Sequence, residues 1–290
     1  MHNKNRSISY SIYVFALIYS GIIIYSPYYS AGNPAFNFVA SSIVGILYAF
    51  ILTRLFTGGR TFLIKAICLW SAIFSVISSV FVVSEYVKEL AEFADYYAEW
   101  AVSLFAVMSI ITCSVLCVRK GKVGAFAFAE LVFPLFVAWT LSGFFAFFTT
   151  RNVVLPDNSI FAVSGVVEHA VKSAVYLCFD ITFSGVLLFA ENNDKASVSG
   201  SLIKGTVWFV LLSGINLVKN LLLFGKDFAL AIKNPDLASL RLVPMFDLPE
   251  ISIVVNTFAG VVRLSACFYI VFVVAKDIFG RKKCFIKEAQ

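Results

Sequence analysis

The chain alternates between long apolar runs and shorter polar segments. Eight runs have about 20 residues or more, the length that an α-helix needs to cross the hydrocarbon core of a bilayer. Their approximate bounds are 8–30, 35–56, 62–84, 98–118, 124–148, 166–190, 200–224 and 251–275. The runs are longer and more uniformly apolar than the alternating strands of a membrane barrel. Because only helices and closed barrels can span lipid, the pattern predicts an all-α polytopic membrane protein with about eight transmembrane helices.

The composition agrees with this interpretation. Of the 290 residues, 60% are hydrophobic and only 14% are charged, whereas an ordinary soluble domain has roughly 25% charged residues. So few charged residues cannot cover the water-facing surface of a chain of this size, so a soluble globular enzyme is nearly excluded. A disordered chain is excluded as well, because disordered chains are poor in large apolar residues and this one contains 31 phenylalanines.

The charges between the runs predict the orientation in the bilayer. Basic residues gather at the amino terminus, after the second run, after the fourth run and in the carboxyl tail. The segment after the third run is acidic instead, and its Glu85, Lys88, Glu89 and Glu92 have helical spacing, so a helical extension of that run is expected. Cytoplasmic loops are enriched in lysine and arginine. With eight spans, both termini are therefore predicted to be cytoplasmic, in a multi-pass protein of the cell membrane.

Three runs in the second half of the chain carry an ionisable residue well inside them. Asp180 is near the middle of the sixth run, Arg263 is near the middle of the eighth, and Lys219 is in the outer third of the seventh. A charge at the centre of a span costs roughly 2.5–3.5 kcal/mol on insertion scales, so such residues face the bundle interior and usually pair. We expect Asp180 and Arg263 to form an ion pair or to contact a ligand; the alternative is a pair that only fixes packing. Lys219 either joins them and Asn256 as a coupling residue or extends its long side chain to the outer surface.

Two runs contain residues that can interrupt a helix. The first has Gly21 and then Ser26-Pro27, and the sixth has Phe183-Ser184-Gly185 close to Asp180. Breaks in the first helix of two successive halves indicate a transporter-type substrate site; the alternative is that glycine and proline are simply common in spanning helices. The sequence favours neither interpretation. The candidate substrate-binding residues are Tyr19, Ser20, Gly21, Ile22, Ser26, Asp180, Phe183, Ser184 and Gly185.

No motif for covalent or metal chemistry accompanies these residues. The sequence has no phosphate-binding glycine-rich loop, no HExxH, no GxSxG and no CxxC, and five of its six cysteines lie in apolar runs, which is typical of small packing residues. We therefore expect no enzymatic activity, no catalytic residue, no metal and no cofactor. Membrane orientation explains the basic segments, so no nucleic acid is expected as a partner.

Several segments, in order along the chain, resemble the endospore germination permease family, the B-type membrane subunit of nutrient germinant receptors. They are GIIIYSP (21–27), FTGGRTF (56–62), RKG (119–121), AELVFPL (129–135), VVLP (153–156), FSG (183–185), FG (224–225) and NP (234–235). That family is similar to the amino acid–polyamine–organocation transporters. The resemblance therefore implies their LeuT/APC-like fold of two inverted five-helix repeats.

Under this resemblance, residues 1–150 form the first repeat. Residues 151–290 form an incomplete second repeat of three helices with a basic cytoplasmic tail, which lacks the last two helices. The resemblance also implies a location in the spore inner membrane and a small nutrient ligand, such as an amino acid, bound between broken first and sixth spans. The implied partners, besides the lipid bilayer, are a second membrane subunit and an outer lipoprotein. A proton- or sodium-coupled amino-acid transporter and a non-binding assembly subunit are the alternatives.

Overall fold

The predicted helices are present throughout the described part of the chain. The computed structural model describes residues 2–25, 33–58, 61–93, 99–142, 144, 167–189, 195–231 and 249–279. Within these residues, the secondary structure consists of eight α-helices without a β-strand. The helices are α1 His2–Tyr25, α2 Pro34–Thr57, α3 Thr61–Phe93, α4 Glu99–Arg119, α5 Lys122–Ser142, α7 Val167–Phe189, α8 Lys195–Ala231 and α10 Pro249–Phe279. Each predicted span coincides with one helix, so the all-α prediction is confirmed.

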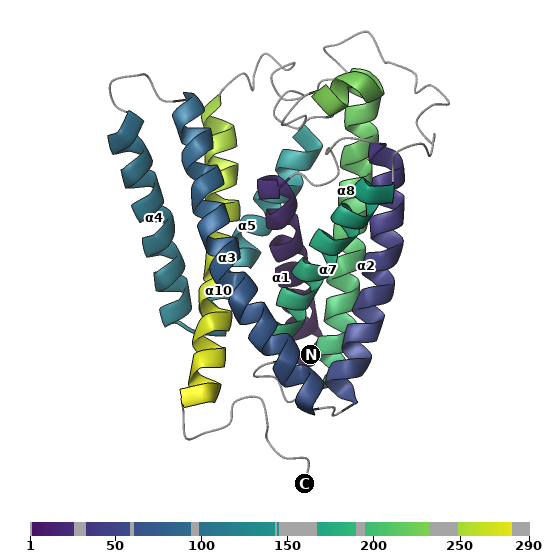
Figure 1. The fold of residues 1–290 in the computed structure, drawn as a ribbon, viewed down its shortest axis with the longest axis vertical. Helices are drawn as coiled ribbons and strands as arrows, with labels where there is room; N and C mark the ends of the chain where they lie inside the picture. Colours follow the sequence, from purple (N-terminus) through teal and green to yellow (C-terminus); the bar gives the residue numbers. More distant parts are fainter. Residues whose placement is uncertain are drawn as a thin grey trace.

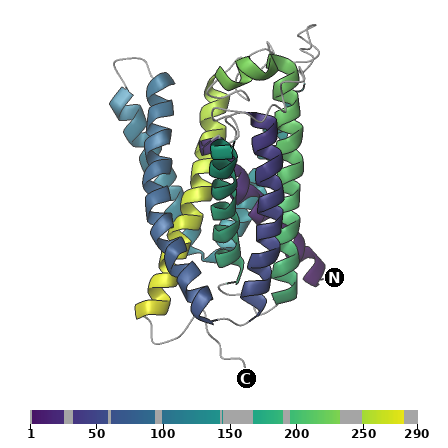
Figure 2. The same ribbon diagram turned by 45° about the vertical axis from the view of Figure 1, so that its right-hand side comes forward.

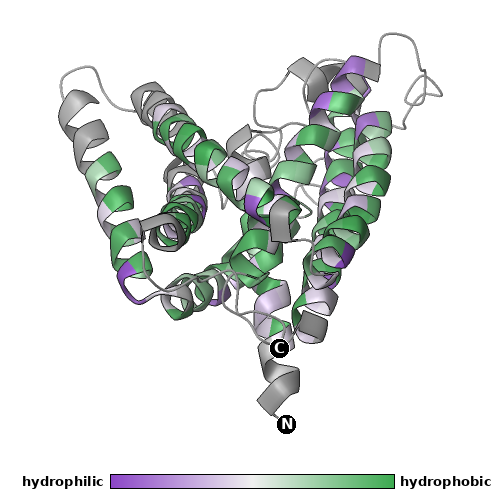
Figure 3. Cartoon of the chain, turned by 60° about the horizontal axis from the view of Figure 1, so that its bottom comes forward, coloured by the Kyte–Doolittle hydropathy of each residue, from purple (hydrophilic) through white to green (hydrophobic). Residues whose placement is uncertain are grey.

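Long apolar stretches make this a multi-pass membrane protein. Among the described residues, six helices (α2, α3, α5, α7, α8 and α10) have stretches long and apolar enough to cross a bilayer, whereas those of α1 and α4 are shorter. Apolar positions cover the helices along most of their length (Figure 3). Large apolar side chains also point outward, and Trp70, Val80 and Leu131 are 61%, 67% and 71% exposed. Soluble monomers rarely expose such surfaces over large areas.

The helices of the two predicted halves interlock. α2 packs along α7, α3 along α10 and α1 along α8 (Figures 1 and 2). α1 lies at the centre, and its residues from Tyr13 to Ser20 are each at most 1% exposed. A helix that is buried on every side needs neighbours on every side, and α5, α7, α8 and α10 supply them. The centre of the bundle is therefore built around the first span.

Several helix ends differ from the expected bounds, and three of them are informative. α3 continues to Phe93, which confirms the helical extension expected from the acidic segment. α5 ends at Ser142, and most of the expected continuation to 148 lies outside the described residues. α8 continues to Ala231 across a kink at Gly225, where φ is 70° and ψ is 172°. Only glycine adopts this backbone conformation readily, so the kink depends on the residue at that position.

The expected helix breaks are absent from the described parts of the first and sixth spans. α1 remains helical through Gly21 to Tyr25, and α7 is continuous from Val167 to Phe189. Of the two interpretations, breaks at Gly21 and Gly185 are therefore wrong; each glycine lies where a neighbouring helix comes close. Ser26-Pro27, the other part of the expected break, lies outside the described residues.

Candidate functional site

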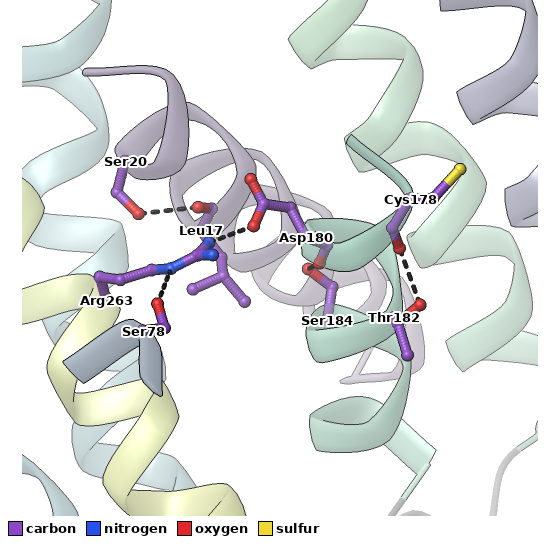
Figure 4. Close-up of polar contacts among 8 residues, drawn as sticks. All are labelled: Leu17, Ser20, Ser78, Cys178, Asp180, Thr182, Ser184 and Arg263. Carbon is purple, nitrogen blue, oxygen red and sulfur yellow. Dashed lines mark hydrogen bonds and ion pairs between the residues drawn. The ribbon is translucent and has the colours of Figure 1, made fainter. Parts of the chain in front are cut away.

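The two central charges meet inside the bundle (Figure 4). Arg263 of α10 forms an ion pair with Asp180 of α7 through Nη1 and Oδ1. Arg263 is 3% exposed and Asp180 is 5% exposed, so both charges are removed from the surface. Burying a charge without a partner costs several kcal/mol. Each of the two residues therefore makes the burial of the other tolerable.

Further contacts fix the guanidinium of Arg263. Its Nε donates to the hydroxyl of Ser78 on α3, at a distance of 3.4 Å from Nε to Oγ. Its central carbon lies 5.0 Å from the centroid of the Phe183 ring on α7, in a cation–π contact. The hydroxyl of Ser184 donates to the backbone oxygen of Asp180 at 2.9 Å. The ion pair thus joins α3, α7 and α10 at one point.

Gly21 brings α1 to the same point. A Cβ atom at this position would lie 3.1 Å from Asp180 Cγ and 3.2 Å from Arg263 Nη1, and closer still to Asp180 Oδ2. A real side chain cannot occupy that space without moving the carboxylate or the helix. α1 therefore packs against the ion pair only because residue 21 is glycine. The first, sixth and eighth predicted spans converge at Gly21, Asp180 and Arg263.

The neighbouring candidates in α1 have other partners. The hydroxyl of Tyr19 is bonded to that of Thr140 on α5, and the Tyr19 ring stacks on Phe15 with centroids 5.4 Å apart. Ser20 is fully buried, and its hydroxyl donates to the backbone oxygen of Leu17 at 2.7 Å (Figure 4). Of these three contacts, the one with Thr140 joins α1 to α5, and the other two lie within α1. The side chain of Ile22 and all of Ser26 lie outside the described residues.

Gly185 faces α2 rather than the ion pair. A Cβ atom there would lie 2.8 Å from Leu52 Cδ2 and 3.6 Å from Phe56 Cε2. Gly45 has the matching position on α2, where a Cβ atom would lie 2.9 Å from Leu177 Cγ. Each helix thus presents a glycine to a leucine of the other, which lets the two backbones approach closely. Gly185 is a packing residue in this structure.

Lys219 and Asn256 are buried as well. Lys219 of α8 is 0% exposed, and Asn256 of α10 is 6% exposed. The expectation that Lys219 reaches the outer surface is therefore wrong. Its surroundings explain this, because Asn216 and Asn220 are buried on the same helix and all three side chains interact within the protein. A polar segment of α8 thus faces inward near the end of the predicted span.

One contact of the site was missed by sequence reasoning. Ser78 is bonded to Arg263 and belongs to a buried row on α3 with Ser71 and Ser75. The spacing of three and four residues is that of one helix face. Hydroxyls on one face of an otherwise apolar span were therefore the signal that the third span faces the ion pair.

The chemistry of the site is that of one buried anion beside one buried cation. Among the described residues, no three histidine, cysteine, aspartate or glutamate side chains come together as metal ligands would. Comparison with known proteins adds no identity, since no family model, no curated protein and no solved structure matches the chain. The resemblance to germination permeases therefore rests on the sequence segments alone.

Proposed function

We propose that this protein is a permease-like membrane protein that binds a small amino acid at Asp180 and Arg263. One observation carries the proposal: an oppositely charged pair is buried where the first, sixth and eighth predicted spans converge. An amino acid has an ammonium group that suits Asp180 and a carboxylate that suits Arg263. A ligand bound in this way neutralises both buried charges when their mutual contact opens. No covalent chemistry is part of the proposal.

The pairing of helices supports the inverted repeat that the resemblance implies. In two inverted repeats, the first span corresponds to the sixth and the second span to the seventh. The contact between α1 and α8 then corresponds to the contact between α7 and α2, and both contacts are present. Within each contact the two helices are parallel: Ser7 lies beside Ser201 and Val14 beside Gly205, while Leu52 lies beside Gly185 and the ring of Phe56 stacks on Phe189. These pairings are those that two inverted repeats produce.

The same correspondence makes the ion pair a reasonable ligand site. Since α1 and α7 are corresponding helices of the two repeats, their mutual contact corresponds to itself. A pseudo-twofold axis that relates the repeats would therefore pass near Gly21 and Asp180. Transporters with inverted repeats hold their substrates near the bilayer midplane at the interface between the repeats. The location of Asp180 near the middle of its span agrees with that depth.

The resemblance supplies the biological setting of the proposal. The ligand would be a nutrient germinant, and the protein would be the permease-like subunit of a germinant receptor in the spore inner membrane. Its partners would be a second membrane subunit and an outer lipoprotein. The basic segments support cytoplasmic termini. In Figure 1, α1 starts and α10 ends toward the same end of the bundle, as expected if both termini lie on one side of the membrane.

A proton- or sodium-coupled amino-acid transporter is the second candidate. It is favoured by the buried carboxylate of Asp180, because carboxylates within membranes commonly belong to proton relays. Vesicles that contain this chain alone distinguish the two functions. Accumulation of labelled amino acid against a gradient indicates a transporter, whereas binding without accumulation indicates a receptor subunit.

Binding to the purified protein in lipid nanodiscs tests the proposal. Tritiated L-alanine and L-leucine are the probes, and Asp180→Asn and Arg263→Gln are each expected to weaken binding by about 10-fold or more, because each removes a hydrogen bond to a charged group. The control is the exposed ion pair of α7, in which Lys172 Nζ lies 2.7 Å from Glu168 Oε1. Glu168→Gln and Lys172→Gln should bind the probes as the wild type does.

Two results would contradict amino-acid binding at the ion pair. Wild-type affinity in folded Asp180→Asn and Arg263→Gln variants would place any bound amino acid elsewhere. Absence of saturable binding of either probe, or of any neutral amino acid, would favour the non-binding assembly subunit instead.

A further inference from the structure

A cavity separate from the ion pair lies between α2, α3 and α7. Its volume is about 570 Å³, which is within the range of roughly 300–1,000 Å³ that small-molecule sites occupy. The walls are almost entirely aliphatic and aromatic, and no charged side chain of the described helices lines them. A carboxylate or a phosphate would lose its solvation there without gaining a counter-charge. The cavity therefore suits a neutral, apolar molecule.

The rim of the cavity faces the bilayer. Val44, Trp70 and Val175, one from each wall, are 44%, 61% and 46% exposed. All three lie inside stretches long and apolar enough to cross a membrane. The surroundings of the mouth are consequently hydrocarbon, and molecules dissolved in the bilayer reach it without passing through water.

One hydroxyl in the cavity wall has no partner among the described residues. Ser71 lines the cavity and is 4% exposed, and its hydroxyl makes no hydrogen bond to any residue that the structure describes. Ser75 and Ser79 on the same helix donate to the backbone oxygens four residues before them, each at 2.7 Å. The other hydroxyls of the wall, those of Tyr48 and Thr182, bond to each other at 2.8 Å. Buried polar groups are nearly always paired, so the hydroxyl of Ser71 indicates a partner that the described part of the chain does not supply.

We propose that this cavity binds a membrane-soluble molecule with an apolar body and a single hydroxyl group, such as a long-chain alcohol. The apolar body packs against the walls, and the ligand hydroxyl bonds to Ser71 when that side chain, whose oxygen is buried in the structure, turns toward the cavity. One residue is shared with the surroundings of the ion pair, because Phe183 lines the cavity and its ring lies 5.0 Å from the guanidinium carbon of Arg263. Binding in the cavity does not require amino-acid binding at Asp180 and Arg263.

Photolabelling of the full chain in nanodiscs tests this site. The probes are hexadecanol that carries a diazirine and a matched diazirine alkane without the hydroxyl. Labelling of α3 and α7 by the alcohol should be saturable and should be competed by unlabelled hexadecanol. Ser71→Ala should weaken the apparent affinity for the alcohol about 3- to 10-fold, as expected for one lost hydrogen bond, and should leave labelling by the alkane unchanged.

Filling the cavity provides the second measurement. Ala174→Trp places an indole in the cavity wall and should remove the saturable labelling. Ala66→Leu, on the opposite wall, serves the same purpose if the tryptophan variant does not fold. The matched control is Ile43→Trp, because Ile43 of α2 is 56% exposed and does not line the cavity; it should label as the wild type does.

Either of two results overturns the proposal. Labelling that does not saturate, or that persists in the folded cavity-filling variants, means that the alcohol only partitions around the protein. An unchanged affinity for the alcohol in Ser71→Ala removes the role assigned to the hydroxyl.

Discussion

Gly21, Asp180 and Arg263 depend on one another. The carboxylate of Asp180 is buried because Arg263 neutralises it, and the pair fits beside α1 because Gly21 has no side chain. Ser78 and Phe183 hold the guanidinium from two other directions. Chemically small substitutions at these three positions should therefore have large effects, whether or not a ligand is bound.

The Gly21→Ala variant tests the steric part of this arrangement. The added methyl group overlaps the carboxylate of Asp180, so we expect a loss of about 1–3 kcal/mol in the free energy of unfolding, the usual cost of overpacking. Thermal unfolding in detergent measures the loss. Gly200→Ala on α8 is the control, since no atom lies within 4 Å of its added Cβ, and it should be neutral or slightly stabilising. Equal stability of Gly21→Ala and the wild type would show that α1 does not press on the pair.

The electrostatic part is tested by a double-mutant cycle on Asp180→Asn and Arg263→Gln. Each single variant leaves one buried charge without its partner, which typically costs about 3–5 kcal/mol. The double variant leaves no charge unpaired, so its loss of stability should be clearly smaller than the sum of the two single losses. Unfolding by titration with a denaturing detergent gives the three values. Additive losses would mean that the two charges are not coupled.

At the scale of the helix, the approximate bounds can be predicted from the sequence, but the structural role of each glycine cannot. Apolar runs bounded by charged residues give the approximate positions of all eight helices, because charged residues are costly in lipid and therefore mark the ends of a span in the sequence itself. The sequence left open whether Gly21 and Gly185 break their helices, and both lie in continuous helices. A glycine loosens a helix or admits a neighbour, and which of the two applies depends on Asp180 and Leu52, which are distant in sequence.

The kink of α8 is a feature that a single substitution tests. Gly225 has a φ of 70° and a ψ of 172°, a conformation that costs other residues about 1–3 kcal/mol. We therefore expect Gly225→Ala to lower the unfolding temperature, whereas Gly200→Ala, earlier in the same helix, should not. If Gly225→Ala were as stable as the wild type, α8 would tolerate a different conformation at residue 225.

At the scale of the whole molecule, the sequence predicts the number of helices but not their neighbours. The apolar pattern of the first run does not distinguish it from the other runs, although α1 is buried from Tyr13 to Ser20. Opposite charges in two spans made a contact between Asp180 and Arg263 a sound expectation. The sequence left two alternatives open for Lys219, and its burial depends on how α8 is rotated within the bundle. Such information lies in long-range contacts, which one sequence does not reveal.

Fusions at the carboxyl terminus test the predicted orientation of the whole chain. A fluorescent protein that matures only in the cytoplasm should fluoresce when fused there, and alkaline phosphatase, which needs an oxidising compartment, should be inactive. Both outcomes follow from the basic residues of the tail and of the segments after the second and fourth runs. The opposite pattern would require an odd number of spans or an inverted bundle.

Amino-acid binding at the buried pair is tested most directly by the double neutral variant, Asp180→Asn with Arg263→Gln. It keeps the bundle free of unpaired charge but offers no charge to the ammonium or the carboxylate of a ligand. Equilibrium binding of tritiated L-alanine and L-leucine to this variant in nanodiscs, beside the wild type, is the measurement. We predict a folded protein that binds neither probe. A folded double variant that binds either of them with wild-type affinity would contradict the proposed function.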